Sequence, residues 1–357
     1  MSAPAVEFRA VSKRYGPIVA VDSISFDIVR GTLVTLLGPS GCGKTSTLRL
    51  IAGLEQPSDG RILIGGADVT TLSAAERDVS MVFQSYALFP HMTVLENVCY
   101  GLRAGGTARA RARELAAVKL ALVGLAGYEK RLPSELSGGQ QQRVAVARAI
   151  VLEPQVLLFD EPLSNLDAKL RRRVREEIRA LQQDLSLTVV YVTHDQEEAL
   201  AVSDRVIVMN TSRIAQDGTP RELYERPNSH FVADFIGDAN LLPVTIERHD
   251  GEQAVVGVGA AIITLPHHGV PPGPAELAIR PRAIRLGAVT GGLTGRIAKA
   301  AYLGDHMEYQ VAVDGLAKEL FVIDANVATP LDTGAAVGIV LDAAGAALVP
   351  PPALVPP

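Results

Sequence analysis

Cysteine is scarce in this sequence of 357 residues and occurs only at Cys42 and Cys99. Two thiols so far apart give no disulfide framework, so we expect a reducing, cytosolic environment. Long apolar runs are also missing, because no stretch approaches the roughly 18 residues of a membrane-spanning helix. Residues 1–7 lack the basic segment and apolar core of a secretory signal. We therefore expect a soluble chain that meets a membrane only through a partner.

Neither sign of charge is in large excess, since 34 basic residues stand against 39 acidic ones and give a net charge of −5. Non-specific nucleic-acid binding needs a basic field, so this composition argues against it, although a local basic patch stays compatible with it. We interpret the cluster Arg171–Arg173 as a solvated helix face paired with Glu176 and Glu177. We predict no nucleic-acid partner. The length allows two or three domains.

The most informative stretch is Gly38–Thr45, which we call the phosphate loop. It matches G-x-x-x-x-G-K-[ST] and stands between an apolar run at 33–37 and a helix-compatible stretch at 45–52, the context that the pattern requires. Backbone N–H groups of such a loop face nucleotide phosphates, Lys44 reaches the β- and γ-phosphates, and the Thr45 hydroxyl binds Mg²⁺. The flanks argue against a chance glycine loop. The predicted nucleotide contacts are Gly38, Pro39, Ser40, Gly41, Cys42, Gly43, Lys44, Thr45 and Ser46.

Two carboxylates, Asp160 and Glu161, follow the apolar run at 156–159. Ligands bind beyond the carboxyl ends of parallel strands, where this run predicts one. Asp160 is placed to hold Mg²⁺ through water, and Glu161 points the other way and is placed to polarise an attacking water. The alternative, that the acids only solvate a strand end, is weakened by the phosphate loop upstream.

A second glycine-containing stretch, Leu136–Gln140, precedes a helical run, and we call it the signature loop. A helix N-terminus preceded by glycines makes a second anion site. Ser137 is equally a good N-cap residue, so this pattern alone leaves both interpretations open.

Short apolar runs alternate with loops and helical stretches over the first two thirds of the chain. This order predicts an α/β P-loop NTPase core, a mostly parallel sheet with helices on both faces. Residues 93 to about 149 have a helical period and predict an inserted helical subdomain. The predicted strands lie at 6–11, 24–29, 62–64, 79–83, 156–159, 189–192 and 206–209, and an amphipathic helix is predicted at 166–185.

After about residue 237, glycine, proline and valine increase and helical periodicity stops. Short runs at 277–286, 309–313 and 337–341 predict a small C-terminal all-β domain, a barrel. We place an ATPase domain at 1–236 with its helical insert at about 91–155. The β domain follows at 237–348, and a proline-rich tail follows at 349–357.

Together these motifs resemble those of the ATP-binding subunit of an ABC transporter. The resemblance assigns Tyr15 to stacking on adenine, Gln84 to sensing the γ-phosphate and Mg²⁺, and His194 to the γ-phosphate. It also assigns Asp167 to a loop that crosses a dimer interface. Each residue alone has another interpretation: a half-buried core tyrosine, a surface amide, a histidine that ends a strand and a helix cap. The assignment depends on seven elements in the family's order.

The resemblance implies a homodimer that sandwiches two ATP molecules. Each ATP meets the phosphate loop of one copy and the signature loop of the other, so that ATP binding closes the dimer and hydrolysis reopens it. Glu161 would act as base or water orienter, His194 would hold the γ-phosphate, and Lys44 with Mg²⁺ would offset developing charge. The residues implied for catalysis are Glu161, His194, Gln84 and Lys44, and those implied for Mg²⁺ are Thr45, Gln84 and Asp160. The residues implied for ATP binding, besides the phosphate loop, are Tyr15, Ser137, Gly138, Gly139, Gln140 and Asp167.

Membrane partners are implied as well. They are two transmembrane permease subunits and, indirectly, an extracytoplasmic solute-binding protein, with this chain peripheral at the cytoplasmic face of the cell membrane. The apolar segment 85–91, directly after Gln84, is expected in the cleft that grips a permease helix, with ordinary core packing as the alternative.

The runs 277–282 and 302–306 resemble the TOBE-like barrel appended to import ATPases. Within that branch we rank ferric iron or a polyamine (spermidine or putrescine) first, then an aminoalkylphosphonate, then a sugar. An ABC ATPase of DNA repair or translation is the alternative of another class. It would show a long coiled-coil insertion or two tandem modules, and the sequence shows neither.

Overall fold

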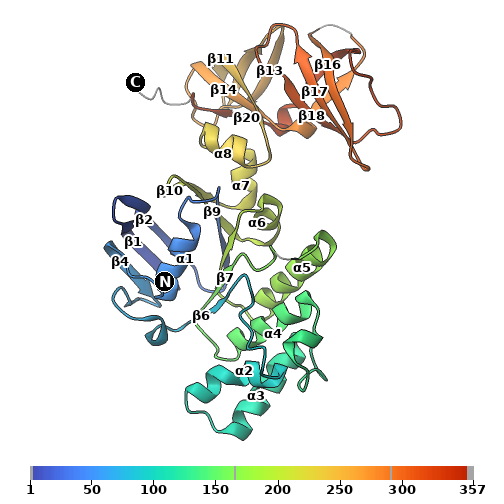
Figure 1. The fold of residues 1–357 in the computed structure, drawn as a ribbon. Coiled ribbons are helices and arrows are strands. Elements are labelled where there is room, and N and C mark those ends of the chain that lie inside the picture. The colour runs from blue at the N-terminus through green and yellow to red at the C-terminus, as the bar shows by residue number, and fades with distance from the viewer. Residues whose placement is uncertain (1–2, 165, 290–291, 352–357) are drawn as a thin grey trace. The chain divides into compact units, whose positions relative to one another are not determined.

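The computed structural model describes residues 3–164, 166–289 and 292–351. The chain divides into two compact units, residues 1–220 and 221–357, and Figure 1 shows the elements of each. The predicted boundary at residue 236 stays a prediction. Among the described residues, no helix has both the length and the apolar character that crossing a bilayer requires. Most of the predicted tail lies outside the described residues.

The first unit contains two sheets and six helices among its described residues. Its strands are β1 (Val6–Tyr15), β2 (Ile18–Ile28), β3 (Leu33–Leu37), β4 (Asp59–Ile64), β5 (Ala67–Asp68), β6 (Val79–Val82), β7 (Val156–Asp160), β8 (Val189–Thr193), β9 (Arg205–Asn210) and β10 (Arg213–Gly218). Its helices are α1 (Lys44–Ala52), α2 (Val94–Ala104), α3 (Arg109–Leu122), α4 (Gly138–Ile150), α5 (Ala168–Asp184) and α6 (Gln196–Val202).

The central sheet has the strand order β10-β9-β3-β8-β7-β6. The five strands from β9 to β6 pair in parallel, and only β10 pairs antiparallel. The prediction of a mostly parallel sheet is therefore confirmed. Parallel pairing brings the carboxyl ends of β3, β8, β7 and β6 to one edge.

Both faces of this sheet are buried, as the near-continuous apolar runs of its strands require. Alternate residues of β3, β7 and β8 divide between two cores. One core is closed by α1 together with the antiparallel sheet β2-β1-β4-β5, and the other by α4 and α5. The sequence predicted helices on both faces. It did not predict the antiparallel sheet as a separate layer over one of them, because alternation identifies a half-exposed strand but not its partner strands.

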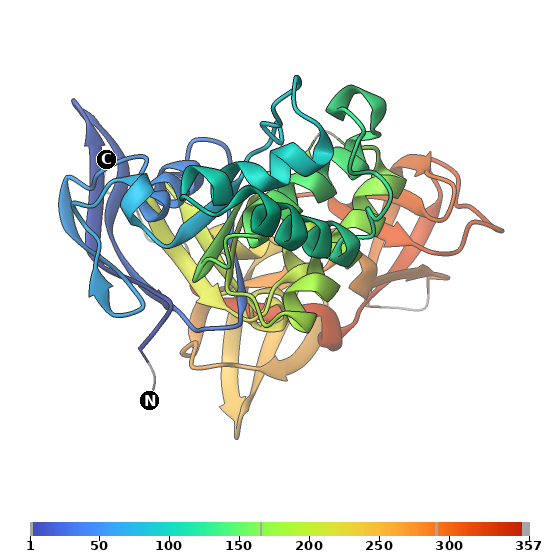
Figure 2. The same ribbon diagram turned by 90° about the horizontal axis from the view of Figure 1, so that it is seen from below.

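The helices α2, α3 and α4 form a cluster around a core of their own, which includes Val94, Ala116 and Val144. Figure 2, which views the ribbon from below, brings α2 and α3 (teal) to the front. Thr93 and Ser137 begin α2 and α4 with capping boxes that bind the first free N–H groups of each helix. These helices lie in the segment where the sequence predicted a helical insert.

The second unit is mainly antiparallel β structure. Two five-stranded sheets, β13-β12-β11-β14-β20 and β15-β19-β16-β17-β18, share one hydrophobic core, in keeping with the predicted barrel. The predicted run at 277–286 is divided between β14 and β15 by a 3₁₀ turn at Pro281–Ala283. The elements are α7 (Pro220–Glu225), α8 (His230–Phe235), β11 (Asn240–Asp250), β12 (Gln253–Val258), β13 (Ala261–Pro266), β14 (Gly273–Ile279), β15 (Ile284–Gly287), β16 (Leu293–Tyr302), β17 (Met307–Val313), β18 (Leu320–Asp324), β19 (Ala336–Leu341) and β20 (Ala346–Val349).

Candidate nucleotide site

Four predicted site elements follow the carboxyl ends of neighbouring parallel strands. The phosphate loop follows β3, His194 follows β8, Glu161 follows β7, and Gln84 lies two residues beyond β6. The register supports this arrangement, since Leu37 pairs with Thr193 across β3 and β8 while Asp160 pairs with Val192 across β7 and β8. This edge is where open α/β sheets bind ligands.

The phosphate loop has a backbone that only glycine fits at two positions. Gly38 and Gly43 have φ of 155° and 101°, and a Cβ on either would lie 2.3 Å from a carbonyl oxygen, that of Met209 or Ala20. Lys44 is buried at the start of α1, and its Nζ donates to the carbonyls of Gly38 at 2.7 Å and Pro39 at 2.9 Å. The loop thus curls around the lysine ammonium at a helix N-terminus, the geometry of an anion cradle.

Cys42 lies inside the phosphate loop with its side chain buried. Burial raises the pKa of this thiol, although the neighbouring Lys44 acts in the opposite direction. The thiol is therefore protonated at neutral pH. Thr45 and Ser46, on the first turn of α1, are half-buried, and Ser40 and Gly41 are exposed at the outer side of the loop.

The acid pair occupies the end of β7. Burial raises the pKa of Asp160, and the like charge of Glu161 adds to this shift. Glu161 has a φ of 43°, in the left-handed region that non-glycine residues rarely adopt, and its N–H donates to Val192 at 3.0 Å. The backbone turns sharply between the two residues, and such strain is concentrated at functional sites. Oxygen donors here suit a hard cation such as Mg²⁺.

His194 lies beside Glu161. The Nδ1 atom of the imidazole is 3.3 Å from Oε2 of the Glu161 carboxylate. The two side chains line a cavity of about 50 Å³, together with Ser164 and with residues of β8, α5 and α6. A cavity of this size has room for a water molecule beside a base.

Gln84 is connected to the same loop. Its Nε2 donates to Ser164 Oγ at 3.1 Å, and that hydroxyl donates to the Glu161 carbonyl at 3.0 Å. The structure thus brings Gln84, Glu161 and His194 together with the loop that precedes α5.

Tyr15 lies at the end of β1 in the antiparallel sheet, and 44% of it is exposed. The Lys13 ammonium lies 4.9 Å from the centroid of the Tyr15 ring, and the Tyr15 hydroxyl donates to Glu55. The turn after Tyr15 leads into β2, whose Ala20 carbonyl packs against Gly43. The partly exposed ring is compatible with stacking on adenine, which stays a prediction.

The signature loop is placed elsewhere. Ser137 caps α4 by accepting from the Gln140 N–H at 3.4 Å, while Gln140 Oε1 accepts from the Ser137 N–H at 3.0 Å. A Cβ added to Gly138 would lie 3.3 Å from Leu166, just before α5, and one added to Gly139 would lie 3.1 Å from Leu170 in the first turn of α5. Within the described part of one chain, these residues contact the start of α5, and no hydrogen bond joins them to the phosphate loop. Asp167 caps α5 by accepting from Leu170 N–H at 3.0 Å.

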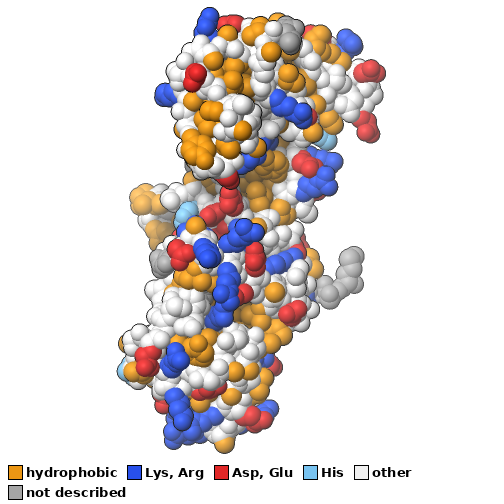
Figure 3. All heavy atoms as spheres, turned by 90° about the vertical axis from the view of Figure 1, so that its right-hand side faces the viewer, with side chains coloured by type: hydrophobic (Ala, Val, Ile, Leu, Met, Phe, Trp, Pro, Cys, Tyr) orange, Lys and Arg blue, Asp and Glu red, His pale blue; other side chains and the backbone are white. Residues whose placement is uncertain are grey.

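The arginine cluster is only partly the solvated face that the sequence predicted. Arg172 and Arg173 pair with Glu176 and Glu177 at 3.3 and 3.1 Å, as expected for residues four apart. Figure 3, which faces the side of the first unit where α5 lies, shows basic and acidic side chains interspersed there. Arg171 differs, since its Nη1 lies 3.4 Å from Asp195 Oδ2 and its Nη2 donates to the Leu166 carbonyl at 3.2 Å.

Sequence reasoning missed a buried carboxyl group behind His194. Glu198 on α6 accepts hydrogen bonds from Thr193 and, at 2.9 Å, from the Tyr191 hydroxyl. Burial raises the pKa of Glu198, while these hydrogen bonds oppose the shift. Asp195 caps the same helix by accepting from the Glu198 N–H at 3.0 Å. The one sequence signal was Asp195 with a carboxyl three residues later, a pattern typical of helix starts.

Similar proteins match most of the chain. The family described as ABC transporter matches residues 21–164, and the TOBE domain matches residues 277–349. The chain is 59% identical to the Fe(3+) ions import ATP-binding protein FbpC 1 of Rhizobium meliloti, over 96% of this chain and 97% of the relative. The chain belongs to the ATP-binding proteins of ABC transporters. It is an ATPase coupled to transport, and the predicted resemblance to the importer branch with a TOBE domain is confirmed.

Two further relatives carry the name Fe(3+) ions import ATP-binding protein FbpC. The protein of Agrobacterium fabrum is 61% identical over 89% of this chain and 90% of its own length. The protein of Escherichia coli is 50% identical over 89% of each chain.

Solved structures confirm the fold of the ATPase core. The cbiO1 protein of Clostridium perfringens, part of an ABC transporter complex, matches with a TM-score of 0.58 and 26% identity over 62% of this chain and 91% of its own. An ATP-binding cassette solved as a dimer in a post-hydrolysis state, bound to ADP and Pi, matches with a TM-score of 0.54 and 31% identity over 60% of this chain and 99% of its own. The predicted P-loop NTPase core is confirmed.

Proposed function

We propose that this chain hydrolyses ATP to drive the import of ferric iron. The observation that carries the choice of solute is the name shared by relatives that are 50% to 61% identical over nearly the whole chain. These relatives favour ferric iron over the polyamine that ranked beside it, and over aminoalkylphosphonate and sugar. Ferric iron is the cargo of the transporter and does not reside in this chain.

The phosphate loop holds the β- and γ-phosphates through its backbone N–H groups. Lys44 exchanges its present carbonyl partners, Gly38 and Pro39, for phosphate oxygens. Tyr15 offers its exposed ring to the adenine. These contacts bind the nucleotide and orient its γ-phosphate toward Glu161 and His194.

Glu161 orients and deprotonates the attacking water in the small cavity that it shares with His194. The imidazole, 3.3 Å from the carboxylate, holds the γ-phosphate and keeps the carboxylate aimed. Gln84 is coupled to the same loop by its hydrogen bond to Ser164.

Thr45 and Asp160, with Gln84, are the groups that would hold Mg²⁺. When bound there, Mg²⁺ would supply positive charge to offset the charge that develops on the phosphate oxygens. The raised pKa of Asp160 supports this assignment, since two adjacent carboxylates at a buried strand end are a place where a cation relieves repulsion.

Two copies of the chain form the working unit in this proposal. Among the residues that the structure describes in one chain, no hydrogen bond joins the signature loop to the phosphate loop, and we infer that its helix end meets a nucleotide held by a second copy. The relative solved as a dimer with ADP and Pi supports this arrangement. The dimer sits on the cytoplasmic face of the membrane against two permease subunits, which receive iron from a binding protein.

The segment after Gln84 is the proposed contact for a permease helix. Tyr86 and Ala87 have φ of 60° and 48°, and their carbonyls accept hydrogen bonds from Arg148 at 2.8 and 2.7 Å. Phe83 and Tyr100 expose 37% and 47% of their surfaces beside it. An anchored, strained loop with exposed aromatic neighbours suits a docking surface.

Uptake by cells tests this proposal. Cells that lack the chain would receive labelled ferric iron, spermidine, putrescine, aminoethylphosphonate or maltose, with or without the wild-type chain supplied in trans. The proposal expects that only iron uptake depends on the chain. Dependence of a different solute, or of none, would overturn the choice of iron.

A further inference from the structure

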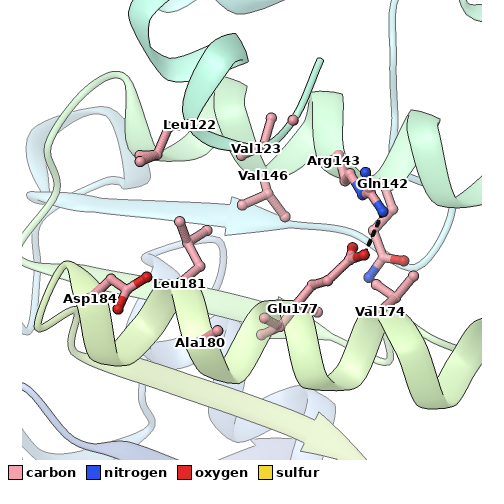
Figure 4. A pocket seen from close by; sticks show the side chains of 12 residues that line it. Leu122, Val123, Gln142, Arg143, Val146, Val174, Glu177, Ala180, Leu181 and Asp184 are labelled. Carbon is pink, nitrogen blue, oxygen red and sulfur yellow. Dashed lines mark hydrogen bonds and ion pairs between the residues drawn. The ribbon is translucent and has the colours of Figure 1, made fainter. Parts of the chain in front are cut away.

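A cavity of about 300 Å³ lies between α4 and α5, near the C-terminal end of α3. Most of its lining is apolar and includes Val146 on α4 and Val174 and Leu181 on α5. Figure 4 shows these side chains facing the space between the two helices. The volume is at the lower end of the range of small-molecule sites.

Gln142 on α4 is the unusual polar group of this cavity. Its exposed fraction is 0%, and neither its Nε2 nor its Oε1 has a hydrogen-bond partner among the described residues. In Figure 4 its amide extends from α4 toward Val174 on α5. Each buried donor or acceptor without a hydrogen bond lowers the stability of the fold by about 1–3 kcal/mol. We therefore expect a partner for the amide of Gln142.

An ion pair lies beside this amide. Arg143 Nη2 lies 2.5 Å from Glu177 Oε1, which the dashed line in Figure 4 marks. The other polar atoms of the pair, Arg143 Nε and Glu177 Oε2, also lack partners within the described part of the chain. One wall of a mostly apolar cavity therefore combines donors and acceptors of Gln142, Arg143 and Glu177, while Asp184 lies elsewhere in the lining.

We propose that this cavity binds a small neutral molecule whose planar group both donates and accepts hydrogen bonds, such as a carboxamide or a urea, on an apolar body. The Gln142 amide pairs with the planar group, and the valine and leucine side chains enclose the apolar body. An anionic ligand is disfavoured because Asp184 also lines the cavity and Arg143 is already paired with Glu177. A protein segment is disfavoured because a specific protein contact buries a much larger area than a cavity of this size offers.

Occupancy of the cavity would act on ATP turnover from a distance. The helix α4 starts at the signature loop, and α5 starts at Asp167, so the bound molecule fixes the spacing of two helices whose first residues we assign to ATP contacts. This effect rests on the proposed function, whereas binding itself does not. We expect kcat to change while the KM for ATP stays the same, since the cavity has no lining residue in common with the phosphate loop.

The test uses benzamide as the probe and acetophenone as its matched partner, which has the same shape but only accepts hydrogen bonds. Binding to the full-length chain is followed by NMR without ATP, and the rate of phosphate release is measured in parallel. Two variants report on the site: Gln142→Leu removes the amide, and Ala180→Phe fills the cavity from its exposed side. Gln183→Leu, an exposed position on α5 outside the lining, is the control.

We expect benzamide to bind wild type and Gln183→Leu about tenfold more tightly than acetophenone does, since one hydrogen bond separates the probes. The preference disappears in Gln142→Leu, and both probes are lost in Ala180→Phe. Equal binding of the two probes to the wild-type chain, or binding of neither, would overturn the proposal and leave water as the occupant of the cavity. Binding without any change in phosphate release would remove the coupling to turnover, while absence of phosphate release altogether would contradict the proposed function instead.

Discussion

The Nδ1 atom of His194 lies 3.3 Å from Oε2 of Glu161, at the shared edge of two adjacent parallel strands. The two residues are far apart in the sequence. Their contact arises because β7 and β8 pair in parallel and both turn away from the sheet at the same level. The left-handed φ of Glu161 completes the geometry by aiming the carboxylate along the edge. We propose this pair as a base and the group that orients it, at the sheet edge where β3 also leads into the phosphate loop.

Glu161→Gln keeps the shape of the side chain but removes the base. We expect phosphate release to fall by about 10²–10⁴-fold, while ATP binding is retained and a nucleotide-bound dimer accumulates. Phosphate release, ATP affinity and molar mass in solution measure these effects. Glu153→Gln, an exposed position, is the control. Turnover within about twofold of wild type in Glu161→Gln would refute the assigned role.

Arg171→Met tests the connection between the start of α5 and the loop after β8. The guanidinium holds both the Leu166 carbonyl and Asp195, the residue that follows His194. Without it the loop carrying His194 loses one anchor, so we expect kcat to fall by about tenfold with little change in ATP affinity. Arg172→Met, which removes only a solvated pair, should behave as wild type. Equal effects of the two variants would contradict the role of Arg171.

Asp204→Asn tests how acid affects stability. Burial alone would raise the pKa of Asp204, but hydrogen bonds from Arg179 and the Leu33 N–H hold it below the ordinary value of 3.8. The stabilisation from the ionised form is therefore complete above pH 3.8 and is lost as the pH falls through the lowered pKa. We expect Asp204→Asn to lower the free energy of unfolding at pH 7 by about 1–2 kcal/mol. Urea unfolding as a function of pH measures this, and a difference that persists unchanged in strong acid would contradict the explanation.

Arg280→Met tests the packing of the second unit. Arg280 is 4% exposed, donates to the carbonyls of Tyr224, Ala233 and Ile236, and lies 4.2 Å above the Tyr224 ring. Its loss leaves three carbonyls without their donor, so we expect a destabilisation of about 2–4 kcal/mol.

The matched control for that variant is Arg282→Met, two residues away and exposed. Thermal unfolding of the intact chain should shift for Arg280→Met and remain unchanged for Arg282→Met. A similar shift in both variants would show that the buried hydrogen bonds of Arg280 do not stabilise this unit.

Sequence reasoning could predict the edge of the central sheet because its signals are local. Apolar runs that end in a glycine loop, an acid pair or a histidine fix the strand ends, and parallel pairing then brings them together. The phosphate loop and the end of β7 were predictable for this reason. The catalytic and binding roles given to these residues stay predictions until variants are measured.

Other features depend on contacts that a one-dimensional pattern does not contain. Arg172 and Arg173 pair with glutamates four residues later, whereas Arg171 pairs with Asp195 from another element. From the sequence, Gln142 is one of several polar residues in a helix, but the fold buries it completely. Such partners come from the packing of α4, α5 and α6, which local propensity does not specify.

The central claim is that hydrolysis at Glu161 drives iron import, and uptake of labelled ferric iron tests it most directly. Cells that lack the chain would be supplied with wild type, Glu161→Gln or Glu153→Gln at matched expression. We expect wild type and Glu153→Gln to restore iron uptake, and Glu161→Gln to leave it at the level of cells without the chain. Iron uptake with Glu161→Gln equal to that of wild type would contradict the account.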